Sequence, residues 1–183
     1  MARTNPINGL KSRAVRIGRF HFALVLFFAV QTIVYHASRV ITPDLLLKRW
    51  IATAALLVIA TLVWYCAKNK VSSLGGFKAL IYVLILADIA FASFNVYTQR
   101  GYASKSVVLF VIPIFIAASL VSRSALYATA LLSVAAYSTT AVMYFVLNFN
   151  EGYLAELYGE IAFYSAIYLA LAALLWTLVR KQK

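Results

Sequence analysis

The stretch that decides the fold is ALIYVLILADIAFASFNVY, residues 79–97, which is almost wholly apolar and has one carboxylate, Asp88, near its middle. Nineteen residues of this kind are long enough to cross a bilayer as a helix. A carboxyl group near the bilayer centre costs roughly 2.5–3.5 kcal/mol unless it is protonated, paired or hydrated. The surroundings of Asp88 are therefore the best starting point for a functional hypothesis.

The composition of the whole chain is that of a membrane protein. Of its 183 residues, 64% are hydrophobic, and 17 Lys and Arg residues oppose 5 Asp and Glu residues. The basic residues lie between and beside apolar runs, as they do on the cytoplasmic flanks of membrane helices, so we expect no nucleic-acid partner. The single cysteine excludes an intrachain disulfide, and no Cys/His cluster, HExxH motif or Ser/His/Asp set is present. We therefore expect no metal, no cofactor and no enzymatic activity.

The apolar runs predict an all-α, polytopic integral membrane protein with one transmembrane domain over residues 20–179. A basic segment, residues 1–19, precedes this domain, and a basic tail, residues 180–183, follows it. Thr42 and Pro43 predict the cap and first position of a helix, and Pro113 predicts a kink. The six expected spans cover about 20–38, 50–67, 79–97, 106–122, 125–147 and 159–179.

The distribution of basic residues predicts the orientation of the chain. Twelve Lys and Arg residues and no acid lie on the flanks that share a side with both termini, and five basic residues lie on the other flanks. The positive-inside rule therefore predicts cytoplasmic N and C termini. We expect the protein in the inner membrane of a prokaryotic cell, with the lipid bilayer as its first partner.

Polar side chains recur at helical spacing in the extracytoplasmic halves of four predicted spans. The span over 79–97 carries Asp88 followed by two amides, and the span over 125–147 carries hydroxyls spaced by four and three residues, beginning at Ser133. These stripes predict a polar, tyrosine-lined cavity that is open to the extracytoplasmic side and has Asp88 near its floor. The predicted ligand-binding residues are Gln31, Tyr35, His36, Asp88, Asn95, Gln99, Tyr137, Thr140, Tyr144, Glu160 and Tyr164. The alternative for Asp88 is a purely structural carboxyl that is hydrogen-bonded to hydroxyls of neighbouring helices.

Part of the chain resembles a known family of membrane domains. The matching features are Asp88, the loop over residues 97–101, Pro113, the small-residue run Ala117–Ala118–Ser119 and the turn Ser122–Arg123. Over about 60 residues they look like the six-helix membrane input module of prokaryotic sensor histidine kinases of the redox- or quinone-responsive type. That family has an outer loop similar to Gly-Gly-x-x-Asn-Pro-Phe, and this chain differs from it at that loop. The chain also ends soon after the sixth span, so the resemblance implies either a stand-alone relative or a truncated sensor.

These features predict a non-enzymatic membrane sensor or small-ligand-binding module. It would bind a small molecule from the extracytoplasmic side and pass a helix shift to a cytoplasmic or membrane protein partner. The first alternative is a small transporter subunit, such as the substrate-binding component of a vitamin uptake system, which has a similar size and number of helices. The second alternative is a structural membrane protein or assembly factor with a dry helix bundle.

Overall fold

The computed structural model describes residues 6–148 and 154–180, and the described chain is helical almost throughout. It contains six α-helices and two short 3-10 helices, η1 and η2, and no strand occurs in these two ranges. In chain order the elements are α1 (Pro6–Ala37), α2 (Pro43–Asn69), α3 (Leu74–Thr98), η1 (Gly101–Ala103), η2 (Lys105–Phe110), α4 (Val111–Ala118), α5 (Arg123–Asn148) and α6 (Leu154–Arg180). The predicted all-α class is confirmed.

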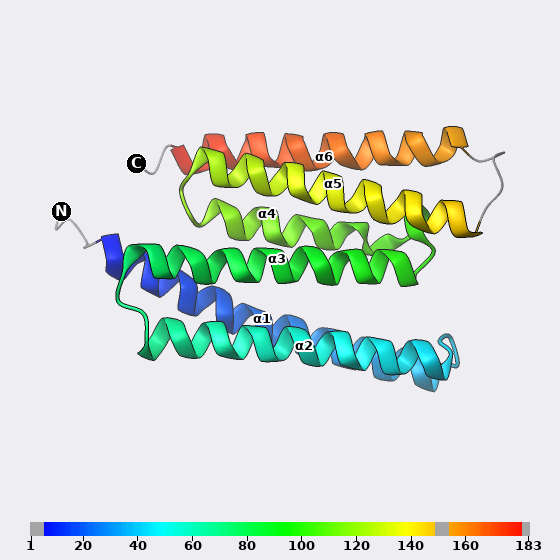
Figure 1. Cartoon of the computed structure of the whole chain (residues 1–183), viewed down its shortest axis with the longest axis horizontal. Coiled ribbons are helices and arrows are strands. Elements are labelled where there is room, and N and C mark those ends of the chain that lie inside the picture. Colours follow the sequence, from blue (N-terminus) through cyan, green and yellow to red (C-terminus); the bar gives the residue numbers. More distant parts are fainter. Residues whose placement is uncertain (1–5, 149–153, 181–183) are drawn as a thin grey trace. The chain divides into compact units, whose positions relative to one another are not determined.

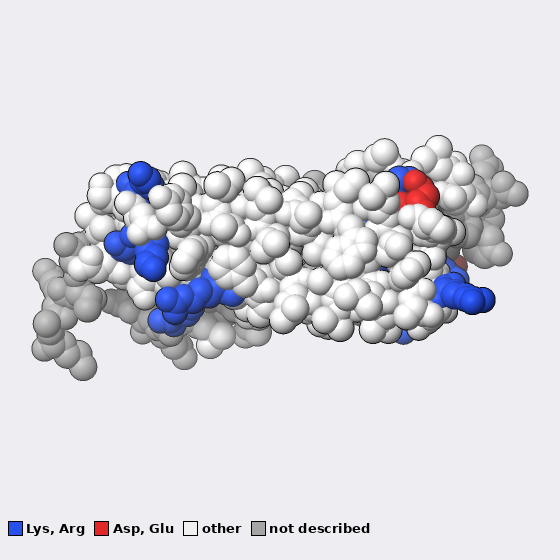
Figure 2. Space-filling view, turned by 90° about the horizontal axis from the view of Figure 1, so that it is seen from below, with Lys and Arg blue, Asp and Glu red and all other residues white. Residues whose placement is uncertain are grey.

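Five of the α-helices are long and apolar enough to cross a membrane, and α4 is the exception. These five helices expose large apolar side chains such as Leu26, Phe27, Val58 and Leu62. On the face drawn in Figure 2, Lys, Arg, Asp and Glu gather toward the helix ends and leave a middle region without them. A broad exposed apolar surface is unstable in water and suits a lipid environment. The chain is therefore a multi-pass membrane protein.

The chain divides into two compact units, Met1–Ala87 and Asp88–Lys183, and α3 contributes to both. In the first unit α1 and α2 pack against each other side by side (Figure 1). Ala60 and Val63 of α2 form a small core with Leu84 of α3, against which Ile17 of α1 also packs. Gly18 of α1 approaches α2 closely, because a Cβ atom there would lie 3.0 Å from the Cβ of Trp64. Small residues at such positions let helix backbones come together.

In the second unit α5 contacts both α4 and α6, and α4 also contacts α6 (Figure 1). Ala130 and Ala141 of α5 and Ala172 of α6 are fully buried, so close packing of small side chains holds these helices together. The hydroxyl of Tyr168 on α6 donates a 2.7 Å hydrogen bond to the carbonyl oxygen of Val107. This bond links α6 to η2 across 61 residues of sequence.

The helices α1, α2, α3, α5 and α6 begin earlier than the predicted spans. Thr42 caps α2 as predicted, since its hydroxyl accepts a hydrogen bond from the Leu45 amide and Pro43 follows at the first position. In contrast, α1 starts at Pro6 and runs without interruption through the predicted basic segment. Lysine and arginine are good helix formers, so charge ends the apolar run without ending the helix. Residues 1–5 of that segment and residues 181–183 of the predicted tail lie outside the described residues.

The region predicted as a fourth span, residues 106–122, differs from a continuous helix. It consists of η2, α4 and a turn that contains Val121 at a positive φ of 52°. Pro113 lies in the first turn of α4, where its missing N–H costs nothing. A continuous α-helix through Pro113 would lose a hydrogen bond and strain the carbonyl four residues earlier, so the preceding turns are 3-10. The six residues of η2 and the eight of α4 give a length of about 24 Å.

Candidate functional site

Asp88 lies on a buried stripe of α3. Asp88 is 4% exposed, Asn95 is 3% exposed, and Ala92 between them is fully buried. A stripe with these spacings lies on one side of the helix. Asp88 begins the second unit, and both polar residues of this stripe are enclosed by protein.

The amides at the end of α3 form a hydrogen-bonded chain. The Nε2 group of Gln99 donates to Oδ1 of Asn95 at 3.3 Å, and its Oε1 accepts a 2.7 Å hydrogen bond from the Ser106 hydroxyl. The Nδ2 group of Asn95 donates to the Phe91 carbonyl oxygen at 2.9 Å. This chain connects α3 to η2 across the intervening loop. Asn95 and Gln99 therefore hold the loop in place, a structural use of two predicted ligand-binding residues.

Tyr144 also packs against this loop. Its ring meets the ring of Tyr97 edge-on at 5.9 Å between centroids. A Cβ atom at Gly101 would lie only 2.4 Å from the Tyr144 ring, and Gly101 has a φ of +59°. Glycine is therefore required here by both the backbone conformation and the close ring.

The predicted tyrosines of α5 and α6 come together in one aromatic cluster, which we define as Phe110, Tyr137, Tyr164 and Tyr168. The ring of Tyr137 lies 6.1 Å from Phe110, 5.6 Å from Tyr164 and 6.2 Å from Tyr168, measured between centroids. All three contacts are edge-to-face, the geometry that aromatic pairs prefer. Of the predicted α6 residues, Tyr164 is thus grouped with Tyr137. Glu160 lies one turn before Tyr164 and is half-buried.

Two hydroxyls at this cluster lack the partners that their neighbours on α5 have. The Oγ of Ser133 and the hydroxyl oxygen of Tyr137 are buried, and no described residue forms a hydrogen bond with either. In the same helix, Thr129 and Thr140 donate to the carbonyl oxygens of Ala125 and Ala136 at 2.9 and 2.7 Å. The hydroxyl of Thr140, a predicted site residue, is therefore hydrogen-bonded within its own helix. Ser133 and Tyr137 are one turn apart, and both of these buried α5 hydroxyls have no hydrogen-bond partner among the described residues.

The three predicted residues of α1 belong to the first unit. The Nε2 group of Gln31 donates to the Tyr35 hydroxyl at 3.4 Å. The guanidinium carbon of Arg49 lies 5.1 Å from the centre of the Tyr35 ring, within the range of a cation–π contact. His36 is exposed. The structure therefore groups Gln31 and Tyr35 with Arg49 of α2, which is not among the predicted ligand-binding residues.

A sequence signal for Arg49 exists in the spacing of α2. The buried residues of this helix recur every three or four positions, and Arg49 is the first of them. Tracing this stripe backward from the apolar part of the helix predicts a buried position 49 and an exposed position 48, as observed. The members of the stripe are Arg49, Thr53, Leu56, Ala60, Val63 and Ala67.

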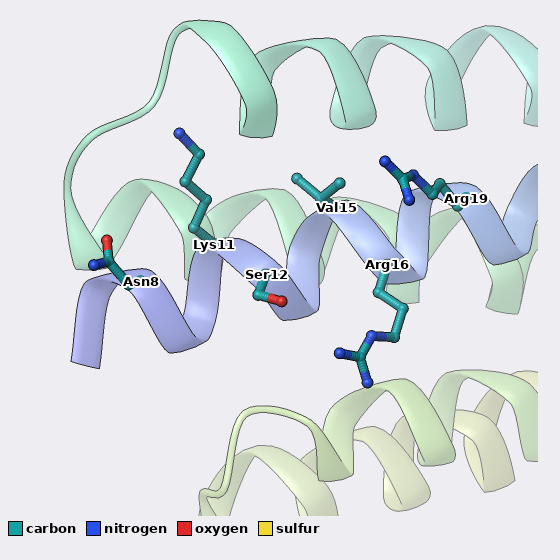
Figure 3. A pocket seen from close by; sticks show the side chains of 6 residues that line it. All are labelled: Asn8, Lys11, Ser12, Val15, Arg16 and Arg19. Atoms are coloured by element: carbon teal, nitrogen blue, oxygen red, sulfur yellow. The ribbon is translucent and has the colours of Figure 1, made fainter. Parts of the chain in front are cut away.

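A separate open pocket of about 490 Å³ runs along the basic half of α1. Figure 3 shows its lining side chains, all of which come from α1: Asn8, Lys11, Ser12, Val15, Arg16 and Arg19. The spacing of these residues puts them on one side of the helix. Leu10 and Ala14 on the other side of the helix are buried, and so is Gly18 at the edge between the two sides. Lys11, Arg16 and Arg19 are exposed and therefore lie outside the core of their unit.

Among the described residues, no group of three or more His, Cys, Asp and Glu side chains is placed to hold a metal ion. Comparisons with protein-family models, curated proteins and solved structures give no match to this chain.

Proposed function

We propose that this protein is a non-enzymatic membrane sensor that binds a small ligand at Ser133 and Tyr137 of α5. The observation that carries the proposal is the pair of buried hydroxyls without partners, one turn apart, beside the aromatic cluster. Leaving a buried polar group unpaired costs about 1–3 kcal/mol, so such groups require an explanation. A ligand that supplies hydrogen-bond acceptors would recover this free energy.

The chemistry of the cluster favours a planar ligand that carries carbonyl groups. Both hydroxyls can donate to a carbonyl oxygen, and the aromatic rings suit a flat apolar ring. This preference agrees with the resemblance to quinone-responsive sensor modules, although the outer loop of the chain departs from that family. Tyr137 is fully buried, so a ligand reaches its hydroxyl only when a packed side chain or helix moves. Binding would then displace α6 relative to α5, and a displacement of this kind is a signal that a protein partner can read.

The proposal includes six crossings with both termini in the cytoplasm of a prokaryotic cell. The segment over η2 and α4 would cross the membrane in addition to the five long helices. Its length of about 24 Å is somewhat less than the hydrocarbon thickness of about 30 Å. The basic side of α1 would then lie against anionic lipid headgroups of the cytoplasmic leaflet.

The test uses the purified full chain in detergent and a short-chain ubiquinone as the probe, with the matching alkylbenzene as the control for nonspecific partitioning. We expect a saturable rise in melting temperature with the quinone alone, and loss of this rise in Tyr137→Phe. Tyr158→Phe is the matched variant, because Tyr158 lies on α6 and is exposed. Equal shifts with both probes, or an undiminished quinone shift in Tyr137→Phe, would rule out the proposed site.

A further inference from the structure

Arg49 occupies a position at which a charged side chain is costly. It lies on the buried stripe of α2 and is 3% exposed, whereas the adjacent Lys48 is exposed. An arginine side chain stays protonated under all conditions that proteins experience. A buried charge without a counterion destabilises a protein by several kcal/mol. The first unit must therefore compensate for this charge in some way.

The contacts of Arg49 within its own unit do not provide a counterion. Its guanidinium lies over the ring of Tyr35 at 5.1 Å. A cation–π contact contributes about 0.5–2 kcal/mol, which is less than the cost of burying the charge. Asp44 is the one acid in the sequence of residues 1–87. Its carboxylate pairs with the Lys48 ammonium group at 2.6 Å and is exposed.

The two nitrogens of Arg49 that have no partner indicate which kind of ligand would fit. Among the described residues, no group forms a hydrogen bond with Nε or with Nη2. These two nitrogens are neighbours on the guanidinium, and their N–H groups point in parallel from one edge. This edge matches the spacing of two oxygens in a carboxylate or phosphate and binds them as a bidentate pair.

We propose that Arg49 is the centre of an oxyanion-binding site, with its Nε and Nη2 groups donating to two oxygens of a carboxylate or phosphate group. Tyr35 holds the guanidinium plane from one face, and the hydrogen bond from Gln31 fixes the Tyr35 hydroxyl. Trp50, the next residue, is exposed, and tryptophan is a residue that anchors helices at the membrane interface. The oxyanion can therefore come from a lipid phosphodiester or from a soluble anion. This site lies in the first unit and does not depend on the ligand proposed for Tyr137.

The experiment measures thermal unfolding of the full chain in a nonionic detergent. The soluble probes are sodium phosphate and sodium acetate, compared with sodium chloride at equal ionic strength. The lipid probe is dioctanoyl phosphatidylglycerol, compared with dioctanoylglycerol, which lacks the phosphate. We expect a saturable rise in melting temperature of several degrees with an oxyanion and little change with its control.

Three variants assign this rise to the guanidinium. Arg49→Gln should abolish the rise in melting temperature. Arg49→Lys keeps the charge but loses the two parallel N–H groups, so it should weaken the apparent affinity at least tenfold. Lys48→Gln, the neighbouring exposed position, should leave it unchanged. A rise with phosphate or acetate identifies a soluble ligand, and a rise with phosphatidylglycerol alone identifies a lipid. The absence of any oxyanion-specific rise in the unmodified chain, or a full rise in Arg49→Gln, overturns the proposal.

Discussion

Removing a single hydroxyl from two neighbouring tyrosines should change stability in opposite directions. Tyr137 and Tyr168 share the aromatic cluster, and their rings are 6.2 Å apart. The Tyr137 hydroxyl is buried, and no described residue forms a hydrogen bond with it. The Tyr168 hydroxyl donates to the Val107 carbonyl oxygen at 2.7 Å. The substitutions Tyr137→Phe and Tyr168→Phe keep both rings, so each isolates the effect of one hydroxyl.

The expected magnitudes follow from the hydrogen bonds. Tyr137→Phe removes an unpaired buried group whose burial costs about 1–3 kcal/mol, so the free energy of unfolding should rise by about 1 kcal/mol. Tyr168→Phe removes a satisfied hydrogen bond with a net worth of about 0.5–1.5 kcal/mol, so the same quantity should fall by about 1 kcal/mol. The two variants should therefore differ by about 2 kcal/mol although they lose the same atom.

The assay is equilibrium unfolding of the ligand-free protein in mixed micelles of dodecyl maltoside and sodium dodecyl sulfate, followed by tryptophan fluorescence. The double variant measures the coupling between the two positions, because residues whose rings are in contact need not have additive effects. If Tyr137→Phe lowers stability as much as Tyr168→Phe does, the Tyr137 hydroxyl has a partner and the reasoning behind the ligand site fails.

Three further predictions concern packing and topology. Gly18→Ala should lower stability, because the alanine Cβ would lie 3.0 Å from Trp64. Gly9→Ala should raise stability by roughly 0.5–1 kcal/mol, because no atom lies within 4 Å of its Cβ and alanine favours a helix more than glycine does. Thermal unfolding of both variants measures these effects. Gly101→Ala should lower the melting temperature more than either change, since a Cβ there would meet the ring of Tyr144 at a positive φ. Reporter fusions at each terminus, read for cytoplasmic or external activity, should place both ends in the cytoplasm.

Each of these predictions has a result that contradicts it. Equal effects of alanine at positions 9 and 18 would mean that α1 and α2 are not in close contact at Gly18. A neutral Gly101→Ala would mean that the loop after α3 can move away from Tyr144. Termini on opposite sides would leave an odd number of crossings, and the segment over η2 and α4 would then be a re-entrant or interfacial element.

The sequence predicted the class of the fold and several local details well. Hydropathy identifies a helix by its length and apolar character, and Thr42 followed by Pro43 has a direct stereochemical reason to start one. Hydropathy does not locate the start of the first helix, which lies 14 residues before the predicted span, because Arg16 and Arg19 end the apolar run but favour the helix. The sequence also predicted Pro113 as a kink inside one helix, whereas the backbone changes from 3-10 to α just before it.

The candidate site was harder to predict, because helical spacing says which residues share a side and not which polar atoms are already bonded. Asn95, Gln99 and Thr140 lie on the expected stripes, yet their polar groups are hydrogen-bonded within the protein. Ser133 and Tyr137 lie on the same kind of stripe, and their hydroxyls have no hydrogen-bond partner within residues 6–148 and 154–180. Only the three-dimensional arrangement separates the two cases, and the same holds for the unpaired edge of Arg49.

The 32 residues of α1 form one uninterrupted helix of about 48 Å, which is longer than the hydrocarbon thickness of about 30 Å. The ring of Tyr35 near one end and the guanidinium groups of Arg16 and Arg19 toward the other are therefore parts of the same rigid rod. A twist of α1 about its axis at the Tyr35 end must turn the arginines by the same angle. The first helix thus provides a mechanical route by which torsion at one end reaches the other, and its close packing against α2 at Gly18 passes that torsion on to α2 as well.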